Sequence, residues 1–233
     1  MVARAPARIV ALVPAAGQGV RLAAGMPKAF VPLLGRPLLW HCVQGLLAAG
    51  CIELVVVAVG AQDRHQAATA LADAGRRVRI VTGGAQRSDS VRRALDSVPD
   101  AEVVLVHDAA RCLTPVGVIQ AVVQEVLAGK RAVVPVLRVV DTIKQVDAED
   151  RVVSTVDRRV LRVVQTPQGF AGDLLRRAHQ RRSGPATDDA GLVEQLGETV
   201  TVLPGHPHAF KITTPFDLAV AETVAGAVAA GRV

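Results

Sequence analysis

Short runs of apolar residues, most of them rich in valine, alternate along this chain with segments of helical spacing. The apolar runs cover about Arg8–Val13, Ile52–Val59, Val78–Thr82, Glu102–His107 and Arg131–Leu137. They are continuous instead of alternating with polar residues, as expected for strands that are buried on both faces. Such strands, separated by helices, predict an α/β fold with a mainly parallel sheet and helices on both faces.

Helical spacing and capping residues place the remaining elements. Helices are expected over Pro37–Ala49, Ser90–Ser97 and about Asp173–Arg182, from Thr114-Pro115 to near Gly129, and from Thr187 and Thr214-Pro215 onward. Threonine followed by proline is a favoured helix start. Two more strands are expected, one near Val200–Leu203 and one that ends at Lys211.

The segment from about Val139 to Val164 does not continue the alternation of apolar strands and helices. Its short, alternating and charged runs predict a β-hairpin with little core of its own. We expect an arm at about 139–164 that projects from a single domain over residues 1–233. An arm that cannot bury its own faces usually finds a partner, which predicts a homodimer.

The composition limits the ligand class and the location. The 233 residues carry a net charge of +6, largely from dispersed arginines, and only 2% are aromatic. An acidic small molecule is therefore favoured over nucleic acid bound by stacking. Three cysteines without a CxxC pair fit a reducing compartment. Because no apolar run approaches the ~20 residues of a bilayer span and the N-terminal run is too short for a signal peptide, we expect a cytoplasmic protein without a membrane partner.

The strongest motif follows the first strand. Pro14, Ala15, Ala16, Gly17 and Gly19 form a loop of small residues, in which backbone N–H groups can approach a phosphate closely. Two basic residues, Arg21 and Lys28, follow and supply the positive charge that a triphosphate needs. The GxxxxGK[ST] pattern is absent and GxGxxG fails at its third glycine, which excludes a P-loop and a dinucleotide fingerprint.

A second motif, His107-Asp108-Ala109-Ala110-Arg111, stands at the carboxyl end of an apolar strand, where open parallel sheets bind ligands. Asp108 is there either a Mg²⁺ ligand or a cap of the next turn. A loop with Gly84, Arg87 and Ser90 could face a base or ribose. No histidine pattern indicates zinc, and no nucleophile for covalent catalysis is apparent.

Two further residues allow two interpretations each. Thr187 is either an N-cap or a ligand contact. Lys211, within an apolar strand pattern, either meets an anion or points outward.

An ordered set of motifs runs from Pro14 to about Asp217: PAAGQGVRL, PKAF, GG with R and S, HDAAR, DTIK, TVDR, TPQ, TDDA and FKIT. This set resembles the 2-C-methyl-D-erythritol 4-phosphate cytidylyltransferases. The resemblance implies a Rossmann-like nucleotidyltransferase fold whose β-arm clasps a second subunit, with CTP and Mg²⁺ as partners. It implies transfer of the cytidylyl group to 2-C-methyl-D-erythritol 4-phosphate in non-mevalonate isoprenoid biosynthesis.

The resemblance also implies roles for single residues. Arg21 and Lys28 would stabilise the transition state, and Asp108 would contact ribose and metal. The CTP contacts would come from Pro14, Ala15, Ala16, Gly17, Gly19, Gly84, Arg87, Ser90 and Ala109. The acceptor phosphate would be held by Arg111, Thr187 and Lys211, with Thr142 and Arg158 reaching in from the partner subunit.

Two positions depart from the family pattern. Ala29 stands where the family usually has glutamine, and Gly191 stands where a serine is usual. Two alternatives remain open at this point. Ribitol 5-phosphate cytidylyltransferases have a similar motif set, and a non-catalytic nucleotide sensor could have the same fold.

Overall fold

The computed structural model describes residues 7–17, 25–181 and 186–230. Within this part of the chain, eight strands form one central sheet with the path β7-β11-β6-β1-β4-β5, and β10 and β12 also pair with β7. The sheet strands are β1 (Ile9–Pro14), β4 (Leu54–Val59), β5 (Val78–Thr82), β6 (Val103–Val106), β7 (Ala132–Arg138), β10 (Arg162–Val164), β11 (Gln168–Ala171) and β12 (Thr201–Pro204).

Parallel pairing dominates, which confirms the predicted sheet type. Strand β1 lies between β4 and β6 and is parallel to both, with Leu12 opposite Val56 and Val106. The exceptions are β10 and β11, which run antiparallel to β7. Strand β11 has no signal in the sequence, because its four residues, QGFA, are too few to show a period.

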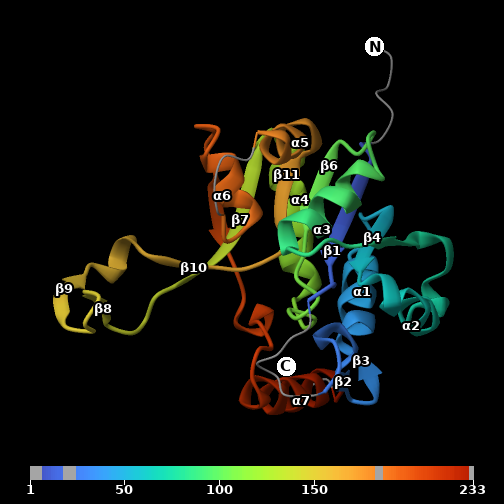
Figure 1. Cartoon of the computed structure of the whole chain (residues 1–233), viewed down its shortest axis with the longest axis horizontal. Helices are drawn as coiled ribbons and strands as arrows, with labels where there is room; N and C mark the ends of the chain where they lie inside the picture. Colours follow the sequence, from blue (N-terminus) through green and yellow to red (C-terminus); the bar gives the residue numbers. More distant parts are fainter. Residues whose placement is uncertain (1–6, 18–24, 182–185, 231–233) are drawn as a thin grey trace.

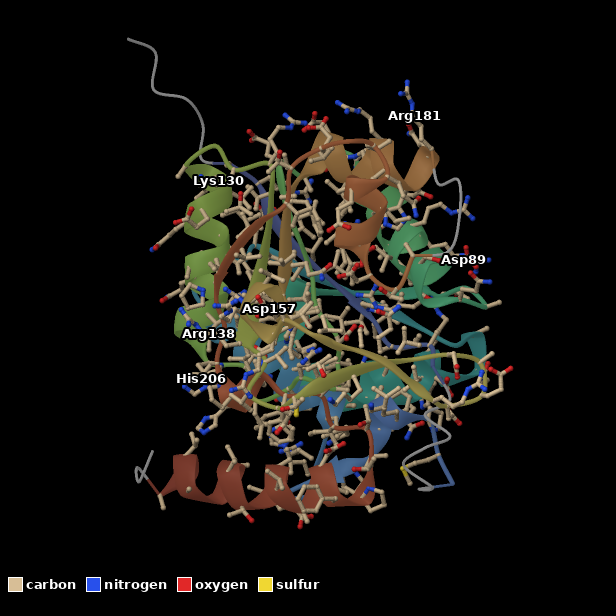
Figure 2. All side chains as sticks on the ribbon, turned by 90° about the vertical axis from the view of Figure 1, so that its left-hand side faces the viewer. Asp89, Lys130, Arg138, Asp157, Arg181 and His206 are labelled. Carbon is tan, nitrogen blue, oxygen red and sulfur yellow. The ribbon has the colours of Figure 1, made fainter. Side chains whose placement is uncertain are left out.

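Helices cover both faces of the sheet. The α-helices are α1 (Leu38–Ala48), α2 (Arg64–Ala70), α3 (Arg87–Asp96), α4 (Val116–Leu127), α5 (Gly172–Gln180), α6 (Asp189–Glu194) and α7 (Pro215–Ala229). Figure 2 shows α4, near Lys130, and α3, near Asp89, on opposite sides of the sheet. In both figures α7 lies across one end of the molecule.

The core divides into two clusters, one on each face. Along β1, Val10 and Leu12 point to the cluster that includes residues of α3, α5 and α6, whereas Ala11 and Val13 point to the cluster of α1 and α4. Successive strand residues face opposite sides, so both faces of β1 are apolar and buried. This is the physical reason for the continuous apolar runs in the sequence.

The strand expected to end at Lys211 is wrong, and the structure excludes one of the two interpretations of Thr187. No strand of the described residues includes Lys211, because a 3-10 turn, η6 (Pro207–Ala209), interrupts the apolar pattern before it. The N-cap of α6 is Asp188, whose side chain accepts a hydrogen bond from Gly191 N, and not Thr187.

The arm projects away from the sheet on one side (Figure 1). Strands β8 (Ile143–Val146) and β9 (Val152–Val156) form a separate antiparallel pair, and the arm exposes apolar side chains such as Val152 and Val160. The segment predicted as arm also includes β10, which belongs to the central sheet, with Arg162 opposite Arg138.

Outside the arm, the two-residue strands β2 (Pro32–Leu33) and β3 (Arg36–Pro37) pair as a short hairpin. None of the helices in the described part of the chain has the length and hydrophobicity to cross a membrane.

Candidate active site

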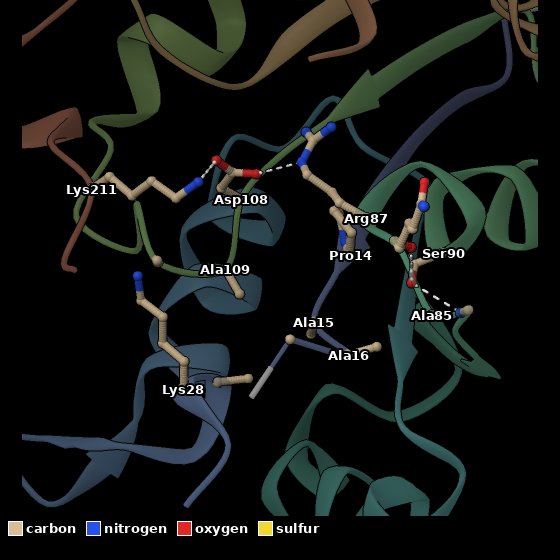
Figure 3. A pocket seen from close by; sticks show the side chains of 15 residues that line it. Pro14, Ala15, Ala16, Lys28, Ala85, Arg87, Ser90, Asp108, Ala109 and Lys211 are labelled. Atoms are coloured by element: carbon tan, nitrogen blue, oxygen red, sulfur yellow. Dashed lines mark hydrogen bonds and ion pairs between the residues drawn. The ribbon is translucent and has the colours of Figure 1, made fainter. Parts of the chain in front are cut away.

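A cavity opens at the edge of the sheet where β1 and β6 end (Figure 3). The carboxyl ends of parallel strands meet at one edge, and in open α/β sheets this edge binds ligands. The lining includes most of the predicted nucleotide-binding residues, namely Pro14, Ala15, Ala16, Gly17, Gly84, Arg87, Ser90, Asp108 and Ala109, together with Lys28 and Lys211. Gly19 and Arg21 lie outside the described residues.

The floor of this cavity is the turn after β1. Ala15 N donates to Ala58 O at 2.7 Å, which ties the turn to the neighbouring strand. A Cβ added at Gly17 would meet no atom of the described residues within 4 Å. The absence of a side chain at Gly17 therefore leaves space for a ligand.

The loop before α3 forms a second wall. Gly84 N donates to Ser90 Oγ at 3.0 Å, and Ser90 Oγ donates to Gln86 O at 3.2 Å. A Cβ at Gly84 would lie 2.3 Å from Asp89 Cβ, so only glycine fits this turn. Ser90 thus shapes the loop that was predicted to read the base.

Asp108 is the centre of the charged groups in the cavity. Its Oδ1 accepts from Arg87 Nε at 3.1 Å, and its Oδ2 lies 2.8 Å from Lys211 Nζ (Figure 3). Burial raises the pKa of Asp108, but the charges of Arg87 and Lys211 outweigh it and hold this pKa well below its usual range. The carboxylate therefore stays ionised at neutral pH between two cations.

The backbone of Asp108 is held separately. Asp108 N donates to Thr166 Oγ1 at 3.0 Å, and the same hydroxyl is 2.8 Å from His107 Nδ1. Burial lowers the pKa of His107 to about 4, so the imidazole is neutral at pH 7. Its Nδ1 can then accept a hydrogen bond from the Thr166 hydroxyl. The buried pair of His107 and Thr166 fixes the direction in which Asp108 leaves the strand.

A second cavity adjoins the first and shares Arg87, Asp108 and Lys211 with it. It adds two more of the predicted acceptor residues, Arg111 and Thr187. Arg111 Nη1 donates to Ala209 O at 2.8 Å, so the guanidinium braces the loop that carries Lys211. Its Nε is buried, with no hydrogen-bond partner among the described residues. Burial lowers the pKa of Arg111, yet arginine remains charged at neutral pH. The three cations of this cavity, Arg87, Arg111 and Lys211, suit a ligand with a phosphate group.

A family model described as 2-C-methyl-D-erythritol 4-phosphate cytidylyltransferase matches residues 9–226. Enzymes of that name from Saccharopolyspora erythraea and Nocardia farcinica are each 57% identical to this chain. The alignments cover 93% of this chain and 98% and 93% of the two relatives. The chain belongs to this family.

Solved structures of the family have the same fold. The enzyme from Thermus thermophilus has a TM-score of 0.75 at 37% identity, over 94% of this chain and 99% of its own. The 4-diphosphocytidyl-2C-methyl-D-erythritol synthase from Anaerococcus prevotii has a TM-score of 0.84 at 25% identity, over 94% of this chain and 96% of its own.

The two departures from the family pattern fall in different places. Ala29, in place of the usual glutamine, is buried and lines the first cavity beside Lys28. Gly191, in place of serine, lies in the first turn of α6, and a Cβ there would be 3.2 Å from Asp188 Oδ1. Neither position supplies a charged group, so both departures leave the cations of the cavities intact.

The two arm residues of the family motif do not reach the cavities within one subunit. Thr142 and Arg158 are exposed and line neither cavity. Arg158 Nη1 instead donates to Val140 O within the arm. The projecting arm therefore separates these two residues from the other predicted site residues of the same chain.

Sequence reasoning missed several polar residues of the site. Thr166 and Gln168 line the second cavity, and Asp189 bonds Arg87. The TPQ and TDDA motifs contain all three residues, but neither spacing nor periodicity indicates a contact with Asp108 or Arg87. Only the pairing of β11 with β6, with Gln168 opposite Val106, brings this segment to the strand end.

Proposed function

We propose that this chain transfers the cytidylyl group of CTP to 2-C-methyl-D-erythritol 4-phosphate, giving 4-diphosphocytidyl-2-C-methyl-D-erythritol and pyrophosphate in isoprenoid biosynthesis. Family membership and 57% identity to enzymes of that name support this activity. The structural observation that carries it is the junction of two cavities at Asp108, since a transferase must hold both reactants side by side.

The reaction needs one phosphorus–oxygen bond made and one broken. A phosphate oxygen of the acceptor attacks the α-phosphorus of CTP in line, and pyrophosphate leaves with the electron pair of the broken bond. The nucleophile is already anionic at neutral pH, so no general base has to remove a proton. Catalysis then consists of positioning and charge stabilisation.

The cations divide between the two cavities. Lys28 lines only the first cavity and points into it (Figure 3), so it suits the CTP phosphates and the charge that grows on the leaving pyrophosphate. Arg111 lines only the second cavity, where it suits the acceptor phosphate. Lys211 and Arg87 line both cavities, next to the oxygens that react. Arg21 would add a further cation to the first cavity by family resemblance.

Magnesium fits this site only as an ion that arrives largely bound to CTP. The described residues contain no cluster of three or more His, Cys, Asp or Glu side chains that could hold a metal. Mg²⁺ is commonly held by one or two carboxylates together with substrate phosphates, and Asp108 is the carboxylate in the cavity. Bound there, the ion would neutralise charge on the phosphates, while Arg87 and Lys211 keep Asp108 ionised.

We also propose that the chain forms a homodimer in the cytoplasm. The arm exposes a series of apolar side chains, including Val140, Val152, Val153 and Val160, and exposed apolar area of this kind favours an interface. Thr142 and Arg158 would then reach the acceptor cavity of the partner subunit, since they do not reach that of their own.

Pyrophosphate release tests the activity. The chain is incubated with CTP and Mg²⁺ and, in parallel, with 2-C-methyl-D-erythritol 4-phosphate or ribitol 5-phosphate. Release with the methylerythritol phosphate alone is expected. Release with ribitol 5-phosphate alone would change the acceptor, and CTP binding without release with either acceptor would indicate a nucleotide sensor.

A further inference from the structure

A buried relay of side chains lies behind Asp108. Arg87 connects two carboxylates: its Nε donates to Asp108 Oδ1 at 3.1 Å, and its Nη1 donates to Asp189 Oδ2 at 2.6 Å. Asp189 Oδ1 in turn lies 3.0 Å from His179 Nε2. Helices α5, α6 and α3 thus supply a continuous chain of contacts that ends at the catalytic edge of the sheet.

The last two members of this relay lie outside the nucleotide and acceptor cavities. The side chains of Asp189 and His179 are only 1% and 3% exposed. Neither residue lines those two cavities, and the hollow that Asp189 does line shares Arg87 with both of them. Taking a carboxylate out of water is costly unless it is well paired. The pairing of Asp189 with Arg87 on one side and His179 on the other offsets that cost.

The backbone around Asp189 is also fixed. Gln168 Nε2 donates to Asp188 Oδ2 at 2.6 Å, and Ala190 N donates to Gln168 Oε1 at 3.2 Å. Gln168 is fully buried at the start of β11. The start of α6 is therefore tied to the central sheet, and Asp189 has a defined position relative to β6 and Asp108.

We propose that Asp189 and His179 are positioning residues of the transfer reaction, which hold Arg87 so that Asp108 keeps one orientation between the two cavities. An arginine side chain held by Asp108 alone could rotate about several bonds. The second carboxylate fixes the other end of the guanidinium, and His179 fixes that carboxylate. The inference rests on the proposed function, because it assigns the relay to that reaction.

The first test replaces Asp189 with asparagine, which keeps the size of the side chain and removes its charge. Loss of the groups that orient metal ligands costs about 10–100-fold in activity, and by analogy Asp189→Asn is expected to lower kcat/KM by about that factor. The matched control is Asp173→Asn. Asp173 is also 2.6 Å from an arginine, Arg131, but both are exposed and line neither cavity. This control is expected to keep wild-type kcat/KM.

A double-mutant cycle separates positioning from general support of the fold. If Asp189 acts through Arg87, Asp189→Asn should lower kcat/KM in the wild-type background but change it less than about twofold in an Arg87→Gln background. An equal loss in both backgrounds would overturn the proposal, and so would wild-type kcat/KM for Asp189→Asn alone. If Asp189→Asn does not fold, His179→Asn is tested instead. It should lower kcat/KM by a smaller factor, and again only in chains that retain Arg87.

Binding of CTP, measured by calorimetry in the same variants, keeps this inference apart from the proposed function. If the wild-type chain releases no pyrophosphate, the proposed function fails. The relay is then tested on CTP affinity alone, where Asp189→Asn should weaken binding only when Arg87 is present. Unchanged affinity in that case would overturn the relay as well.

Discussion

Lys211 Nζ lies 2.8 Å from Asp108 Oδ2, and this ion pair joins the loop after η6 to the loop after β6. The two residues are separated by more than a hundred positions in sequence, yet both line the nucleotide and the acceptor cavities. Asp108 does not depend on Lys211 alone, because Arg87 also pairs with it. Removing the lysine charge should therefore change the reaction more than the fold.

Lys211→Met is expected to raise the KM for the acceptor and to lower kcat by about 10²–10³-fold, the usual cost of one lost donor to developing charge. The methionine keeps the apolar stem of the side chain. Steady-state kinetics of pyrophosphate release measure both constants. Lys130→Met, at an exposed position beyond α4, is the control and should leave both constants unchanged.

Lys28→Met should have a different kinetic signature from Lys211→Met. Lys28 lines the first cavity and not the second, so the KM for CTP should rise and kcat should fall by about 10²-fold, with little change in the KM for the acceptor. Titration of each substrate at saturating concentrations of the other distinguishes the two variants. A normal CTP KM and normal turnover would contradict the assignment of Lys28 to the triphosphate.

Glycine substitutions in the first cavity should separate ligand space from protein packing. Gly17→Ala adds a methyl group that meets no atom in the described part of the chain, whereas the same change at Gly84 forces a contact with Asp89. We therefore expect Gly17→Ala to keep the wild-type melting temperature and to weaken CTP binding. Gly84→Ala should weaken binding and also lower the melting temperature. Calorimetry and thermal unfolding measure the two effects independently.

Protonation of His107 should make the native state less stable in mild acid. Its pKa in the native protein is about 4 because the imidazole is buried, whereas an unperturbed histidine has a pKa of about 6.5. Below pH 6.5 the unfolded chain takes up a proton that the native state does not, so stability falls as the pH falls and levels off near pH 4. Over this window the loss amounts to about 3 kcal/mol.

The histidine contribution is isolated by His107→Asn, whose amide oxygen can replace Nδ1 as the acceptor for Thr166. Denaturant unfolding of both proteins is compared at pH 7.5 and at pH 5. The wild-type protein should lose more stability between these two values than the variant does. Equal losses would mean that other groups cause the acid sensitivity.

The sheet and its covering helices could be predicted from the sequence because both faces of β1 and β4 are buried, which makes their apolar runs continuous. Short elements gave no comparable signal. The four residues of β11 are recognised only from their pairing with β6 and β7. The apolar pattern around Lys211 was misleading, since Ala209 is buried in the 3-10 turn η6 and Ile212 in the loop that follows, and neither lies in a strand.

The site was predictable where function imposes a local pattern, as in the small residues after β1 and the acidic residue after β6. The supporting residues were not, because their roles depend on tertiary contacts. Nothing in the sequence around His179 or Asp189 indicates that these two side chains meet each other and Arg87. Contacts between three different helices cannot be read from spacing along one chain.

The predicted dimer assigns Thr142 and Arg158 to the acceptor cavity of the partner subunit, and mixed dimers can test this assignment. An Arg158→Ala chain and a Lys28→Ala chain, each inactive alone, are co-expressed with different tags. If Arg158 acts in the partner, each mixed dimer contains one site with an intact pocket and an intact arm. Random assortment then restores about a quarter of wild-type activity.

The matched control for this experiment combines two pocket variants, Lys28→Ala and Lys211→Ala. Both changes lie in the cavities of their own subunit, so every site in a mixed dimer carries one of them and no activity should return. Recovery in the first mixture but not in the second would support an arm that acts across the interface. If neither mixture recovers although mixed dimers are isolated by their two tags, Arg158 acts within its own subunit, and the arm must then fold back toward its own cavity.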